Sequence, residues 1–115
     1  MAVLSENLDF VFIKATEGSK HLDDKFAYNY AEARGTDLRV GAYHFFSFES
    51  GGDTQADNYI ANVEKFDGML PPVVDVELYG DYRADLLPAE DVVPQLKTLL
   101  EKLEEHYGVK PMIYA

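Results

Sequence analysis

The sequence predicts an α/β domain built on a parallel sheet. Short apolar runs rich in β-branched and aromatic residues alternate with segments of helical periodicity, and glycines such as Gly35 and Gly68 separate them. This alternation implies right-handed crossovers between parallel strands. Two architectures fit: a small doubly wound sheet, or part of a (β/α)8 barrel. A whole barrel takes about 250 residues, so the 115 residues here would supply about half of one.

The first half of the chain contains two predicted strands and two predicted helices. Residues 9–14 form a β-branched and aromatic run typical of a buried strand. Apolar residues recur at helical spacing over residues 24–33, and Gly35 lies just past the end of that helix. A second strand is predicted over residues 38–46. A second helix, with an apolar stripe on one face, follows over about residues 54–65.

The second half repeats the alternation. A pair of prolines precedes a third strand at residues 73–77, and a long loop rich in Tyr, Gly and Asp follows at residues 78–87. Leucines and valines at helical spacing predict a third helix over residues 89–107. A fourth strand is predicted to begin at residues 110–114.

Composition excludes several classes of function. The net charge of −11 argues against nucleic acid as a partner, because phosphate binding needs a basic surface. No apolar run approaches the length of a membrane span. The absence of cysteine excludes a disulfide framework and thiolate metal sites. The first residues have neither a basic start nor an apolar stretch, so we expect no signal peptide within this chain.

The most informative residues are Asp75 and Glu77, at the end of the third predicted strand. Side chains at positions i and i+2 of a strand point to the same face, with Cα atoms about 7 Å apart. Crowded carboxyls can acquire different pKa values, giving the proton donor and the anion that glycoside hydrolysis needs. Two other interpretations stay open: a Mg²⁺ or Ca²⁺ site, or a structural pair in which one acid caps a helix and the other bridges to Lys14.

Other candidate residues lie at the C-terminal ends of strands, where active sites of parallel α/β folds are found. Lys14 and Glu17 are interpreted either as an ion pair or as part of such a site. The side chain of His44 is expected on the face opposite its aromatic neighbours, which favours a hydrogen-bonded packing histidine over a catalytic base. The aromatic candidates either stack on sugar rings or belong to the core: Tyr43, Phe45 and Tyr114.

Five segments together resemble the family 25 glycoside hydrolases, the Chalaropsis-type lysozymes, in family order and at family spacing. They are FVFIKATEG at 10–18, VGAYHFF at 40–46, QADNY at 55–59, LPPVVDVE at 70–77 and KPMIY at 110–114. The resemblance implies a partial (β/α)8 TIM-type barrel of about four parallel strands with three helices. Residues 1–115 would then be a single catalytic-domain fragment.

The resemblance also implies an activity and its residues. The activity is that of an N-acetylmuramidase, which hydrolyses the β-1,4 bond between N-acetylmuramic acid and N-acetylglucosamine in peptidoglycan without a cofactor. Glu77 matches the general acid, and Asp75 matches the carboxylate that assists the N-acetyl group or the attacking water. The residues that fall where the family lines its groove are Lys14, Glu17, Tyr43, Phe45 and Tyr114.

The chain departs from the family pattern at both ends. The family's first strand, with its Asp-Val-Ser motif, and its later strands are missing, so we expect a truncated protein whose isolated chain is weakly active or inactive. We expect a homodimer that covers the open barrel edges. The full-length protein is expected outside the cell or in the cell wall. A non-catalytic remnant that binds peptidoglycan, and a small metal-dependent α/β protein, are the alternatives.

Overall fold

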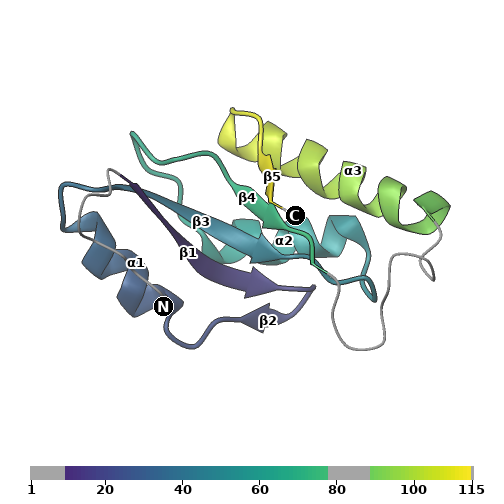
Figure 1. Ribbon diagram of the computed structural model, residues 1–115, viewed down its shortest axis with the longest axis horizontal. Helices are drawn as coiled ribbons and strands as arrows, with labels where there is room; N and C mark the ends of the chain where they lie inside the picture. The colour runs from purple at the N-terminus through teal and green to yellow at the C-terminus, as the bar shows by residue number, and fades with distance from the viewer. Residues whose placement is uncertain (1–9, 78–88, 115) are drawn as a thin grey trace.

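A computed structural model describes residues 10–77 and 89–114 of the protein (Figure 1). A five-stranded sheet with the order β2-β1-β3-β4-β5 forms its centre. The strands are β1 (Phe10–Glu17), β2 (His21–Leu22), β3 (Arg39–Phe45), β4 (Val73–Asp75) and β5 (Met112–Tyr114). The helices are α1 (Phe26–Arg34), α2 (Gly52–Asn62) and α3 (Ala89–Tyr107).

The four strands predicted from the sequence pair in parallel, with a helix between each strand and the next. The third predicted helix has the observed bounds of α3, whereas β4 ends at Asp75 and leaves Glu77 just beyond the strand. The prediction missed β2, which pairs antiparallel with the end of β1 over two residues. A strand this short has no periodicity to detect. The loop predicted over residues 78–87 lies outside the described residues.

The three helices share one core with a single face of the sheet. Alternate strand residues such as Val11, Ile13 and Val74 are buried in the same apolar cluster as residues of all three helices. The helical members of this cluster include Phe26 and Tyr30 of α1, Ala56 and Tyr59 of α2, and Leu99 and Leu103 of α3. A doubly wound sheet would have helices on both faces. The described residues instead form part of a (β/α)8 barrel, with the helices outside, and this confirms the fold expected from the resemblance.

Helices α2 and α3 approach each other closely at one glycine. A Cβ atom on Gly52 would lie 1.9 Å from the backbone carbonyl oxygen of Gln95, so only glycine fits there. The Gln95 side chain also accepts a hydrogen bond from the Gly52 N–H at 2.8 Å. This contact fixes where α3 lies against the start of α2. Of the helices that the structure describes, none is both long and apolar enough to cross a bilayer.

Candidate active site

The register of the sheet brings the predicted site residues into two rows on the face away from the helices. Residues paired between neighbouring parallel strands point to the same side of a sheet. One row therefore crosses four strands at their C-terminal ends: Glu17, Phe45, Asp75 and Tyr114. The row beneath it contains Lys14, Tyr43, Val73 and Met112. We call this side of the sheet the open face, since no described helix covers it.

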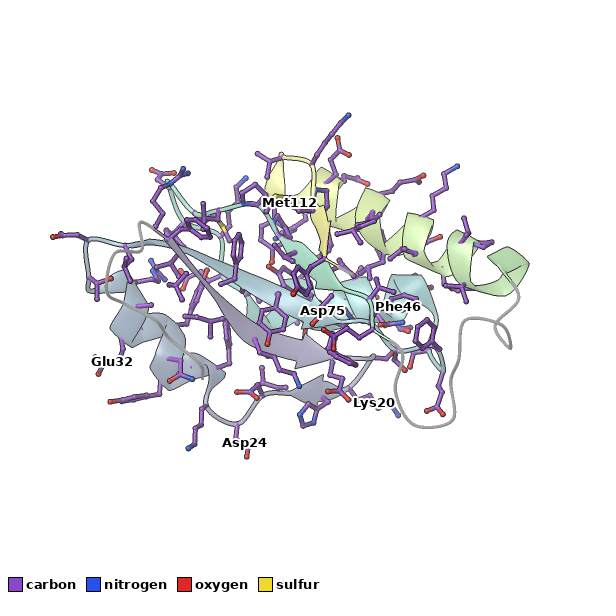
Figure 2. The ribbon with its side chains drawn as sticks, viewed as in Figure 1. Lys20, Asp24, Glu32, Phe46, Asp75 and Met112 are labelled. Atoms are coloured by element: carbon purple, nitrogen blue, oxygen red, sulfur yellow. The ribbon has the colours of Figure 1, made fainter. Side chains whose placement is uncertain are left out.

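The open face contains a hollow of about 510 Å³. Its lining residues are Phe10, Phe12, Tyr43, Val73, Asp75, Met112, Ile113 and Tyr114. Figure 2 shows Asp75 and Met112 on the neighbouring strands β4 and β5. A Cβ atom on Gly41 would lie 2.7 Å from the Phe12 ring, so glycine at this position lets that ring lie over β3. The hollow is thus mostly apolar, with one carboxyl in it.

Asp75 is the electrostatically unusual residue of the hollow. Its Oδ1 atom is buried and has no hydrogen-bond partner among the described residues. Burial raises the pKa of Asp75 to about 6, and the negative charge of Glu77 and a hydrogen bond between the two side chains add to this rise. The charge of Lys14 opposes it. Asp75 and Glu77 therefore interact directly, as their spacing in the sequence predicted.

Lys14 and Glu17 form an ion pair beside these carboxyls, with 3.0 Å between Nζ and Oε1. The Lys14 ammonium also lies 5.4 Å from the centre of the Phe45 ring. Burial lowers the pKa of Lys14, but its hydrogen bond to Glu17 and the surrounding negative charges outweigh burial, so the net pKa is raised and the side chain stays charged. The ion-pair interpretation is confirmed, and Lys14 pairs with Glu17 rather than with Asp75 or Glu77.

His44 points away from the open face into the core, as predicted. It is completely buried between Thr16, whose Oγ1 lies 2.7 Å from Nδ1, and Gln55, whose Oε1 lies 2.8 Å from Nε2. Burial lowers the pKa of His44. The imidazole is therefore a neutral packing group that does not reach the hollow.

The structure places every predicted site residue on the open face or at its rim, with Glu77 exposed just past β4. Sequence reasoning missed the aromatic and aliphatic residues that complete the hollow. The alternation of the strands could have identified them. Phe10 and Phe12 share the period of two that places Lys14 on this face, and Val73 shares it with Asp75. No group of three potential metal ligands gathers within residues 10–77 and 89–114.

A half-barrel sheet with a coupled carboxyl pair at the C-terminal end of a strand defines the chain as a (β/α) barrel protein with a carboxylate site. The sequence profile of the family "Glycosyl hydrolases family 25" matches residues 2–115. The chain belongs to this family.

Relatives and solved structures agree with this assignment. The uncharacterized protein YegX of Escherichia coli K12 is 37% identical over 108 residues, which are 94% of this chain and 38% of YegX. An N,O-diacetylmuramidase of Chalaropsis sp is 34% identical over 91% of this chain and 54% of its own length. A family 25 glycosyl hydrolase structure from Bacillus anthracis matches 95% of this chain and 50% of its own, with 50% identity and a TM-score of 0.92. The chain thus spans about half or less of these proteins.

Proposed function

We propose that this chain carries the acid pair of a muramidase, a glycosidase that cleaves the β-1,4 bond between N-acetylmuramic acid and N-acetylglucosamine. The observation that supports this most is the interacting Asp75–Glu77 pair, with the pKa of Asp75 raised to about 6, at the edge of a hollow lined by rings. A glycosidase needs a carboxyl that holds a proton near neutral pH beside one that is ionised. Relatives named as muramidases and lysozymes point to the same chemistry.

In this proposal Glu77 is the general acid. It is exposed at the rim and so is open to a glycosidic oxygen, whereas Asp75 lies deeper in the hollow. A sugar ring placed over Glu77 would exclude water from it, and a carboxyl without water around it disfavours the charged form. Because the two carboxyls interact, the proton that Asp75 holds is available to Glu77.

Asp75, once it has given up that proton, is the assisting carboxylate. Asp75 and Glu77 lie two residues apart at the end of β4 and interact with each other, so they approach the sugar from one side. This geometry supports an action of Asp75 on the substrate's N-acetyl group, next to the anomeric carbon, over direct attack from the far side.

The remaining predicted residues would hold the glycan. Tyr43 and Tyr114 line the hollow and would offer their rings for stacking on sugars, while Phe45 lies beside Asp75 in the same row and contacts the Lys14 ammonium. Burial raises the pKa of Tyr43, and the negative charges of the neighbouring carboxyls raise it further, while the charge of Lys14 opposes the rise. The Tyr43 hydroxyl therefore remains a hydrogen-bond donor. Lys14 and Glu17 supply polar contacts at the edge.

The proposed substrate is peptidoglycan, and the whole protein is proposed to act outside the cell or in the cell wall, in keeping with the lysozymes and muramidases among its relatives. We expect weak activity from the 115 residues alone, because they match about half of each family structure. The rest of the groove in a closed barrel would come from the other strands.

A second copy of the chain is proposed to cover the open face. Phe10, Met112 and Tyr114 are 44–63% exposed, and the outer edge of β5 is unpaired among the described strands. Two such sheets related by a two-fold axis would pair β5 of each copy with the first part of β1 in the other, before the residues that pair with β2, and so close a ring. Sedimentation over a range of concentrations should show a dimer. A compact monomer at all concentrations would contradict this proposal.

The alternative function is peptidoglycan binding without catalysis, which the ring-lined, largely apolar hollow favours. One experiment separates the two. Purified peptidoglycan is incubated with a high concentration of the chain, reduced with borohydride and analysed by mass spectrometry, with a parallel pull-down. New reduced muramic acid ends support the muramidase. Pull-down without new ends supports the binding protein. If the chain neither releases new ends nor binds peptidoglycan, both proposals are contradicted.

A further inference from the structure

Strand β1 breaks its own alternation next to the carboxyl pair. Lys14 pairs with Tyr43, but Thr16 pairs with the next residue of β3, His44, so Ala15 is an extra residue in the ladder. Ala15 and Thr16 are consecutive and both completely buried on the helix side. A regular strand would place Thr16 on the open face and Glu17 under the helices. The bulge reverses this, and Glu17 reaches the open face beside Lys14.

Two contacts hold the bulge. The Thr16 side chain is hydrogen-bonded to the His44 ring across the two strands at 2.7 Å. The carbonyl of Ala15 accepts a hydrogen bond from the N–H of Asp23, the residue that follows β2, at 2.8 Å. Without these partners, the bulge would bury an unsatisfied hydroxyl and an unsatisfied carbonyl, which destabilises a fold.

The donors and acceptors of this contact are fixed by Gln55. Its amide nitrogen donates to the carbonyls of Ser47 and Ser50, and its Oε1 accepts from the Ser47 N–H at 2.9 Å. Because Oε1 is the acceptor, the His44 Nε2 that faces it at 2.8 Å is protonated and donates. Nδ1 of the neutral ring is then the acceptor, and the Thr16 hydroxyl donates to it. Every side-chain polar atom of the chain Thr16–His44–Gln55 therefore has at least one assigned partner.

We propose that Thr16 and His44 are positioning residues of the active site, which hold the β1 bulge so that Glu17 stays on the open face and engages Lys14. This proposal rests on the proposed function for its consequence in catalysis. His44 itself touches no reacting atom. Its effect passes through the bulge: when Glu17 holds the Lys14 ammonium, less of that positive charge acts on Asp75, and Asp75 keeps its proton more readily.

The test compares Thr16→Val, which keeps the shape and loses the hydroxyl, with Thr16→Ser, which keeps the hydroxyl. Tyr107→Phe is the control for stability, because it removes a buried hydrogen bond of 2.7 Å to the Val63 carbonyl within the helix layer. The readout is the titration of the Asp75 carboxyl by NMR in the full 115-residue chain. It is followed together with the amide signal of Glu17.

In Thr16→Val we expect the proton affinity of Asp75 to fall roughly threefold to tenfold, because the released ammonium favours the carboxylate. The Glu17 amide signal should shift as well. Thr16→Ser should restore both, and Tyr107→Phe should change neither. Equal titrations in Thr16→Val and the original chain would overturn the proposal. The readout needs no turnover, so the positioning role can hold even if no reduced muramic acid ends are found.

Discussion

The two faces of the sheet are built from alternate residues of the same strands, yet they differ in burial and in how their polar groups are paired. On the helix side, buried polar groups are matched: Tyr59 donates to the Ala42 carbonyl at 2.8 Å, and His44 is hydrogen-bonded on both ring nitrogens. On the open face, Asp75 keeps a buried oxygen without a described partner, and Tyr114 is 63% exposed. The helix side stabilises the fold, whereas the open face contains a carboxyl with a raised pKa, which is typical of active sites.

The largest expected effect is on catalysis at the open face. Glu77→Gln keeps the shape of the side chain and removes its proton, so we expect the release of reduced muramic acid ends to fall about 10²–10⁴-fold. Glu101→Gln makes the same change of charge on the exposed surface of α3 and should leave the rate unchanged. Equal rates for both variants would remove Glu77 from the mechanism.

The next effect is on stability at the helix side. Leu99 of α3 is completely buried, and Leu99→Ala should lower the free energy of unfolding by about 2–5 kcal/mol. Met112 on β5 is 44% exposed, and Met112→Ala should cost less than about 1 kcal/mol. Urea unfolding of the two variants measures the contrast. Similar losses would mean that the open face is as well packed as the helix side.

A substitution at the contact between α2 and α3 should lower the free energy of unfolding by a smaller amount. Gly52→Ala places a methyl group against a backbone carbonyl that cannot rotate away, so we expect a loss of about 1–3 kcal/mol. Gly35→Ala is the matched control: its new Cβ atom would meet its nearest neighbour at an ordinary 3.4 Å. Thermal unfolding should show a clear decrease for the first variant and little change for the second.

The smallest effect is the dependence of stability on pH from Asp75. Its folded pKa of about 6 lies above the ordinary 3.8, so the fold disfavours the charged form. Its contribution to stability is therefore complete below pH 4 and is lost as the pH rises to about 6. Asp75→Asn should raise the unfolding temperature at pH 7.5 and change it little at pH 4. Because the side chain is only half-buried, we expect less than about 1 kcal/mol.

Local periodicity explains what the sequence could predict. Alternation over residues 38–46 and helical spacing over residues 89–107 each reflect burial of one face, so these two assignments succeeded, as did the convergence of Lys14, Asp75 and their neighbours. The same rule failed at β1, where the bulge at Ala15 depends on a contact 28 residues away in the sequence, between Thr16 and His44. The proximity of Gly52 to Gln95 is equally invisible to local patterns.

The central claim is that Asp75 and Glu77 form one coupled acid pair. Its most direct test is the NMR titration of the Asp75 carboxyl in the original chain and in Glu77→Gln. We expect a midpoint near pH 6 in the original chain. We expect a clearly lower midpoint in the variant, where the second negative charge is gone. A midpoint near 3.8 in the original chain, or the same midpoint in both proteins, would contradict the claim.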